Sequence, residues 1–104
     1  MKKNRLVLSD AAAADLVEQT DWYSAQSGKA LAARWDAAVS SAIMRVLTRP
    51  NTGTRCQFRA AELHDLRRIT IPGFHKHLLF YKFDRGEVFV MRIVHGARDL
   101  EELL

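Results

Sequence analysis

The residues of this chain best suited to acid–base chemistry lie in its C-terminal half. Histidine titrates near neutrality and can act as a general base, and arginine can stabilise the negative charge that develops when a phosphodiester is attacked. If the protein cleaves nucleic acid, its candidate catalytic residues are Arg68, His77, Arg92 and His95. The alternative is structural, because a His-Lys-His run such as residues 75–77 often only solvates the start of a strand.

We expect neither a metal ion nor a cofactor. The histidines at positions 75, 77 and 95 have no carboxylates placed to complete a tetrahedral metal site. The sequence also contains no glycine-rich phosphate loop. A structural role is open for the end of the chain as well, where His95 can cap a strand while Arg98 pairs with Asp84 or Asp99.

The chain is basic, with a formal net charge of +4 at pH 7. From Arg55 to Arg98 there are nine Lys and Arg residues against four Asp and Glu residues, and the tail that follows is acidic. This distribution favours a polyanionic target or an acidic partner. A basic, solvated surface without a target is the alternative.

A chain of 104 residues is expected to form one domain, residues 1–104. Its single cysteine, Cys56, cannot form an internal disulfide, which suits a reducing compartment. The apolar run Leu6–Leu8 is too short for a signal peptide or a membrane span. We therefore expect a cytoplasmic protein that does not enter a membrane.

The first half of the sequence predicts a short strand and two helices. Residues 4–8 alternate weakly, and Ser9 can then cap a helix that Gly28 ends. Apolar residues recur every three or four positions from Leu31 to Val46, and Pro50 terminates this second helix. The two helices are expected to form a hairpin.

Beyond Gly53 the period of the pattern changes from 3.6 to 2, which predicts strands. Residues 66–71, 77–83 and 88–94 are the three candidates, and a turn at residues 84–86 joins the last two. The order β-α-α-β-β-β predicts an α+β fold in which the N-terminal strand and helical hairpin pack on a small antiparallel sheet.

Both faces of the last strand are apolar, although two helices can cover only one face of a sheet. Strict alternation places Phe89, Met91 and Ile93 on one face and residues 88, 90, 92 and 94 on the other. An uncovered apolar face usually marks an interaction site. A partner is therefore expected on this face or along the adjoining helices, at Val88, Val90, Arg92, Val94, Trp35 and Val39.

Several segments together resemble the RelE/ParE superfamily of type II toxins, over nearly the whole chain. They are Leu8-Ser9 before an alanine-rich helix with Asp15-Leu16, the region of Trp22, Arg49-Pro50 followed by Gly53, residues 66–69, residues 79–83 and residues 90–99. The strand that runs into His95-Gly96-Ala97-Arg98-Asp99 is the most specific of them.

The resemblance implies one of two activities. RelE-like members cut messenger RNA on the ribosome with sheet lysines and arginines and a C-terminal tyrosine or histidine, whereas ParE-like members inhibit DNA gyrase. Here no tyrosine follows Tyr81, residues 55–75 contain no lysine, and the ending at residues 95–99 is more like ParE. Gyrase inhibition without catalysis is therefore favoured over an mRNA interferase, and the target-binding candidates are Arg67, Arg68, Lys76, His77, Arg92, His95 and Arg98.

The resemblance also implies a cognate antitoxin that forms a hetero-oligomer with this chain. An acidic, amphipathic antitoxin segment would suit the basic half of the chain. A third possibility is a non-toxic family member that only binds an antitoxin and acts as part of a repressor complex.

Overall fold

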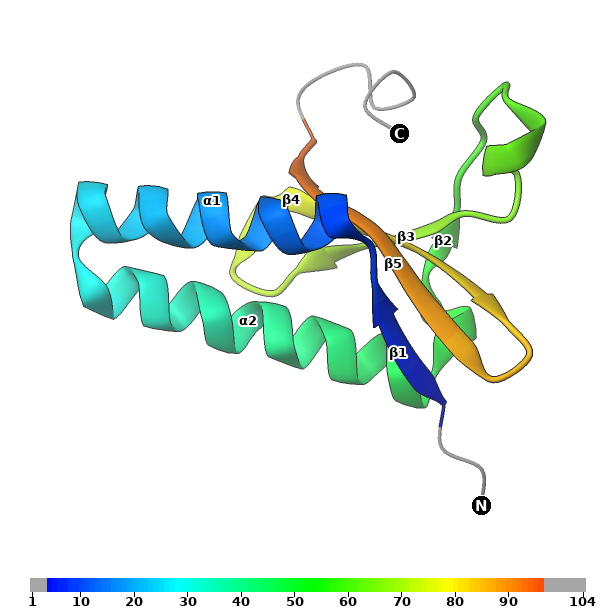
Figure 1. The fold of residues 1–104 in the computed structure, drawn as a ribbon, viewed down its shortest axis with the longest axis horizontal. Coiled ribbons are helices and arrows are strands. Elements are labelled where there is room, and N and C mark those ends of the chain that lie inside the picture. Colours follow the sequence, from blue (N-terminus) through cyan, green and yellow to red (C-terminus); the bar gives the residue numbers. More distant parts are fainter. Residues whose placement is uncertain (1–3, 97–104) are drawn as a thin grey trace.

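A computed structural model describes residues 4–96 of the chain, which form an α+β domain (Figure 1). Its elements follow the predicted order, with one two-residue strand and two short 3-10 helices in addition. They are β1 (Arg5–Leu8), α1 (Asp10–Ser27), α2 (Lys29–Thr48), η1 (Pro50–Thr52), β2 (Thr54–Arg55), η2 (Ala61–Leu63), β3 (Arg67–Ile71), β4 (Phe74–Asp84) and β5 (Glu87–His95).

The strands of residues 4–96 form one sheet in the order β1-β5-β4-β3-β2. The pairs β2–β3, β3–β4 and β4–β5 are antiparallel, but β1 lies parallel to β5, so the sheet is mixed rather than purely antiparallel as expected. The predicted turn between β4 and β5 has positive φ angles at Arg85 (50°) and Gly86 (77°). Two such angles suit the right-handed twist of a tight hairpin.

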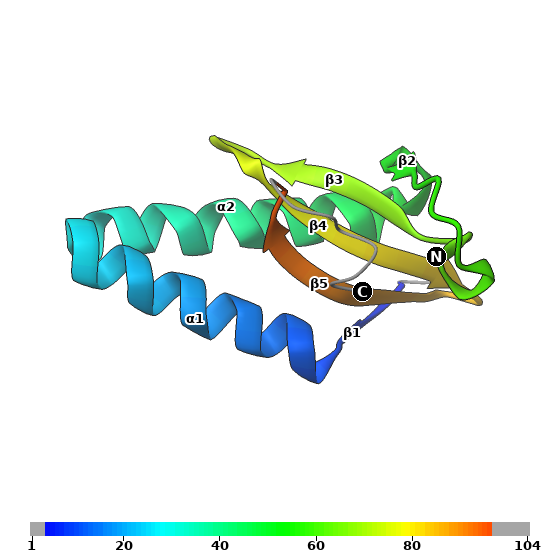
Figure 2. The same cartoon turned by 90° about the horizontal axis from the view of Figure 1, so that it is seen from above.

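The helical hairpin lies on one side of the sheet and extends beyond it (Figure 2). Ser9 begins α1, since its hydroxyl accepts a hydrogen bond from the Ala12 N–H at 2.9 Å. Gly28, with a φ of 85°, makes the sharp connection to α2 that its sequence position predicted. No helix within residues 4–96 is long and apolar enough to cross a membrane.

A β-bulge in β5 changes which side chains face the helices. Phe80 pairs with Arg92 and Tyr81 pairs with Val90, so Met91 is an extra residue between them. Val88, Val90 and Ile93 consequently lie together in the core under the helices, while Met91 and Val94 pack in a second cluster. The strict alternation expected for this strand is therefore wrong beyond Val90.

The two faces of the sheet have separate hydrophobic clusters. The larger one lies between the sheet and the helices and includes Trp35, Val46 and Tyr81. The smaller one centres on Phe80 and Leu66, and the segment between β2 and β3 covers it with Cys56 and Leu63. The opposite face is therefore partly covered, because the chain from residue 56 to 66 folds back over it.

Candidate binding groove

An open groove of about 850 Å³ lies between α1 and the adjoining ends of β4 and β5. Asp15, Trp22 and Tyr23 line its helix side, and Phe74 and Val94 are among the residues on its sheet side. The groove exists because β1 pairs with β5 only as far as Val90. Beyond that point α1, rather than a strand, runs beside β5 (Figure 1).

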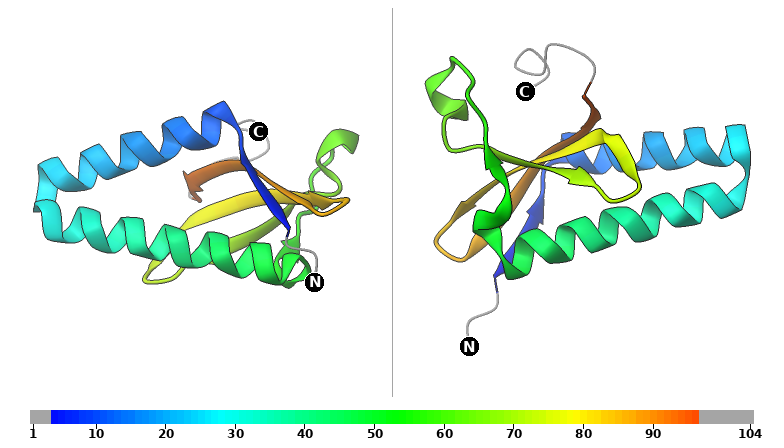
Figure 3. Two further views of the ribbon diagram at one scale, coloured as in Figure 1. Left: turned by 60° about the horizontal axis from the view of Figure 1, so that its bottom comes forward. Right: turned by 180° about the vertical axis from the view of Figure 1, so that it is seen from behind.

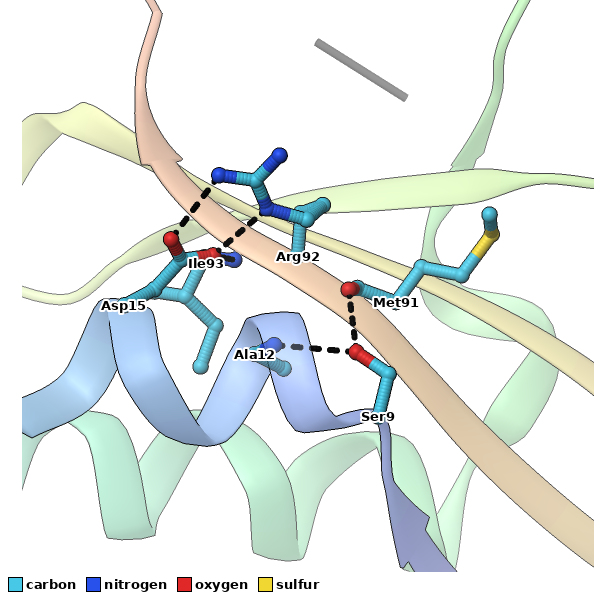
Figure 4. Close-up of polar contacts among 6 residues, drawn as sticks. All are labelled: Ser9, Ala12, Asp15, Met91, Arg92 and Ile93. Atoms are coloured by element: carbon cyan, nitrogen blue, oxygen red, sulfur yellow. Dashed lines mark hydrogen bonds and ion pairs between the residues drawn. The ribbon is translucent and has the colours of Figure 1, made fainter.

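Polar side chains from the start of α1 hold this part of β5 (Figure 4). Ser9 Oγ donates a hydrogen bond to the Met91 carbonyl at 2.6 Å. Asp15 accepts from Arg92 Nε at 2.8 Å, from Arg92 Nη2 at 2.9 Å and from the Ile93 N–H at 3.0 Å. These hydrogen bonds raise the pKa of Arg92 above its ordinary value, against a smaller opposing effect of burial.

His77 forms the floor of the groove inside a cage of aromatic rings. Its ring centroid lies 4.7 Å from that of Trp35 and 5.4 Å from that of His95, and Phe74 also packs nearby. The Tyr23 hydroxyl and His77 Nε2 share a hydrogen bond of 3.0 Å. Burial, with a further contribution from the charge of His95, lowers the pKa of His77. The imidazole is therefore neutral at neutral pH.

The rim of the groove combines apolar and basic groups. Trp22 is 55% exposed, which is unusual for so large an apolar side chain. His75, Lys76 and His95 are exposed on the sheet side, and Glu18 lies opposite them on α1. Such a surface suits an amphipathic segment with acidic side chains better than a small neutral ligand.

Four of the seven target-binding candidates meet in this groove, namely Lys76, His77, Arg92 and His95. The other three do not. Arg67 donates to the Gly53 carbonyl at 2.8 Å, which holds the chain before β2, and Arg68 projects from β3 where it pairs with Phe80 on the face away from the helices. Arg98 lies outside the described residues.

Of the six candidates for partner contact, Val94 and Arg92 line the groove. Trp35, Val88 and Val90 are 0% exposed and Val39 is 3% exposed, so these four offer no surface to a partner. For the two valines on β5 the expectation failed because the face on which they lie, which was expected to be uncovered, is the face that the helices cover. For the two α2 residues it failed because the apolar stripe of α2 faces the sheet.

Three of the four nuclease candidates, His77, Arg92 and His95, line the groove, whereas Arg68 does not. His77 and His95 are neighbours, but His77 is only 6% exposed and lies under the helices. Arg92 is bound to Asp15, and Arg68 lies on the opposite face of the sheet. The Asp15 carboxylate therefore occupies Arg92 Nε and Nη2, the groups that would stabilise the charge of an attacked phosphodiester.

Sequence reasoning missed the α1 side of the groove. Trp22 is exposed on α1, whereas Tyr23 packs against the helix-side core and also shares a hydrogen bond with His77. Asp15 was noted only as part of a helical motif. No local signal distinguishes Asp15 from Asp10 at the start of the same helix, since its need for a partner follows from its burial in the folded protein.

The fold and the groove define a small α+β domain in which two helices cover one face of a mixed five-stranded sheet within residues 4–96. Residues 6–100 match the family model described as the ParE toxin of the type II toxin-antitoxin system parDE, and the chain belongs to this family. A solved chain from the chromosomal ParDE toxin-antitoxin system of P. aeruginosa has the same fold, with a TM-score of 0.73 at 18% identity. The similarity covers 89% of this chain and 96% of that one. No curated protein matches the sequence.

Proposed function

We propose that this ParE-family toxin inhibits DNA gyrase and that a cognate antitoxin neutralises it by docking in the groove between α1 and β5. The observation that carries the first half is that neither candidate arginine is available beside His77 and His95 to bind a phosphate. Arg92 is engaged by Asp15, and Arg68 is on the other face of the sheet from His77. This arrangement favours a protein that acts by binding its target, as a gyrase inhibitor does, over one that cleaves a phosphodiester.

The shape and chemistry of the groove support the antitoxin half of the proposal. Trp22 and Phe74 provide apolar contact area, and exposed aromatic side chains often carry much of a protein–protein binding energy. Lys76 and His95 add positive charge at the rim. An acidic, amphipathic antitoxin segment would bury the two aromatic side chains and form ion pairs with the basic residues of the rim.

The test is a supercoiling assay with purified gyrase and relaxed plasmid, run beside a ribosome-dependent mRNA cleavage assay. Inhibition of supercoiling that the coexpressed antitoxin relieves is the expected result. Cut messenger RNA with normal supercoiling would overturn the proposal in favour of an mRNA interferase. No effect in either assay, and no toxicity on induced expression, would leave a non-toxic antitoxin-binding protein.

A further inference from the structure

A second pocket of about 500 Å³ opens at the other edge of the sheet, beside β3. Arg45 in the last turn of α2 and Arg68 on β3 both line it, although 23 positions separate them. Thr54 on β2 lies beside Arg68 as its cross-strand partner, and Thr70 follows two positions later on the same face of β3. The end of α2 and the short strand β2 lie beside this edge (Figure 3).

Four exposed side chains that line this pocket can donate hydrogen bonds to a ligand, namely Arg45, Arg68, Thr54 and Thr70. Within residues 4–96, the Arg45 and Arg68 guanidinium groups make no hydrogen bond or ion pair with another residue. The Thr54 and Thr70 hydroxyls make no hydrogen bond within the same range. No carboxylate is among the residues that line the pocket. Two arginine side chains therefore line one pocket without a carboxylate among its lining residues, an arrangement that favours an anion.

We propose that this pocket binds a phosphate of the DNA backbone, a contact that deepens the proposed function because gyrase works on DNA. Arginine and threonine side chains are common phosphate ligands, and the planar guanidinium can donate two parallel hydrogen bonds to one phosphate. The alternative ligand, an acidic peptide, would need apolar anchors. The pocket provides only the half-buried side chains of Ile69 and Leu78.

The site lies away from the antitoxin groove. Arg68 belongs to the face of the sheet opposite the helices, at the β3–β2 edge, whereas the groove is beside β5. A toxin bound to gyrase could therefore touch DNA at one edge of its sheet without using the groove residues. This placement makes the two surfaces separable by mutation.

The experiment measures binding of a short labelled DNA duplex to the isolated toxin by fluorescence anisotropy over a series of salt concentrations. The double variant Arg45→Gln/Arg68→Gln is compared with Lys29→Gln/Arg34→Gln, which removes the same charge from exposed positions on the first half of α2. We expect the first pair to bind about tenfold more weakly, with a salt slope lower by about one phosphate contact. The control pair should keep nearly all of the affinity.

A third variant, Arg45→Lys/Arg68→Lys, separates geometry from charge, and is expected to lose several-fold in affinity because lysine cannot donate a bidentate pair. Equal losses in the two glutamine pairs would overturn the proposal, since they would show only general attraction to a basic protein. A loss of antitoxin binding in the Arg45/Arg68 pair, with DNA binding intact, would also overturn it.

The supercoiling assay separates this proposal from the proposed function. If the unaltered chain does not inhibit gyrase but the Arg45/Arg68 variant loses DNA binding, the phosphate site is supported and the gyrase assignment is wrong. Gyrase inhibition by the unaltered chain, with no change in DNA binding for the variant, would remove the phosphate site alone.

Discussion

Asp15 Oδ2, on α1, accepts hydrogen bonds from both Arg92 Nε and the Ile93 backbone N–H. It therefore binds the edge of β5 just beyond the residues that pair with β1. The side chain of Asp15 is 12% exposed and that of Arg92 is 24% exposed. A partly buried, bidentate pair of this kind differs from an exposed ion pair, because removal of one partner leaves the other desolvated. The contact also fixes α1 against the strand that leads to His95.

Replacement of Asp15 by alanine should lower the free energy of unfolding by about 2–4 kcal/mol. The loss has two parts, namely the bidentate pair with Arg92 and the hydrogen bond from the Ile93 N–H, which is left unsatisfied. Urea denaturation followed by circular dichroism would measure it. The matched control is Arg5→Ala, which breaks the exposed Arg5–Glu87 pair (79% and 37% exposed) and should cost below about 1 kcal/mol. Equal costs for the two variants would contradict this account.

A close approach between Gly53 and Tyr81 gives the second prediction. The Tyr81 hydroxyl accepts from the Gly53 N–H at 2.9 Å and donates to the Pro50 carbonyl at 2.6 Å, which ties the chain after α2 to the central strand β4. A Cβ at position 53 would overlap the Tyr81 hydroxyl and lie 2.8 Å from its Cε1. Gly53→Ala should therefore destabilise the protein by about 2 kcal/mol or more.

The double-mutant cycle with Tyr81→Phe tests the mechanism of that loss. Tyr81→Phe alone should cost about 1–3 kcal/mol, because the Gly53 N–H and Pro50 carbonyl lose a buried partner. In the Tyr81→Phe background the added methyl group no longer meets a hydroxyl, so Gly53→Ala should cost less than it does in the unaltered chain. Additive effects in thermal unfolding experiments would show that the contact is not the cause.

The residue pattern predicted the helices and the tight turn correctly but could not reveal the bulge in β5. The helix from Leu31 to Val46 was found because its apolar side chains recur on one stripe, and the tight turn at Arg85-Gly86 was found from its glycine. The bulge at Met91 was not, since all residues from Val88 to Val94 except Arg92 are apolar and fit either face. A one-residue shift in such a strand exchanges its faces without leaving a trace in the pattern.

The groove was only half predictable for a related reason. Lys76, His77, Arg92 and His95 attract attention by residue type, and the structure does bring them together. Their partners Asp15 and Tyr23 are 77 and 54 positions away from the residues they bind. No local pattern reports contacts between residues so far apart along the chain. The parallel pairing of β1 with β5, which sets α1 beside β5, was itself not expected.

The buried His77 makes stability depend on pH. Burial lowers its pKa in the folded protein below the ordinary value of 6.5, with a smaller contribution from His95. The unfolded chain therefore binds more protons than the folded one as the pH falls below about 6.5, and the free energy of unfolding decreases with it. Above that pH the histidine is neutral in both states and this effect vanishes.

Urea denaturation at a series of pH values on both sides of 6.5 would measure this effect of His77. The groups that face its ring are Tyr23, Trp35, Phe74 and His95. The variant His77→Gln should flatten the acid limb of the stability curve. The control His64→Gln, at an exposed position, should leave that limb unchanged.

Trp22 offers the sharpest test of the antitoxin groove, because its side chain is exposed on the wall of the groove and contributes little to the core. Its ring makes an edge contact with Tyr23 at 5.5 Å but is 55% exposed. Trp22→Ala should therefore change the free energy of unfolding by less than about 1 kcal/mol. It should weaken antitoxin binding by about 2 kcal/mol, which is about thirtyfold in Kd.

The matched control is Met44→Ala, which removes a similarly exposed apolar side chain (58%) from α2, away from the groove. Isothermal titration calorimetry of the toxin variants with the antitoxin gives both affinities. A Trp22 variant that binds as tightly as the Met44 variant would place the antitoxin elsewhere. A large loss confined to Trp22, in a variant that keeps its melting temperature, requires the antitoxin to bury this side chain, since no change in folding could then account for the lost affinity.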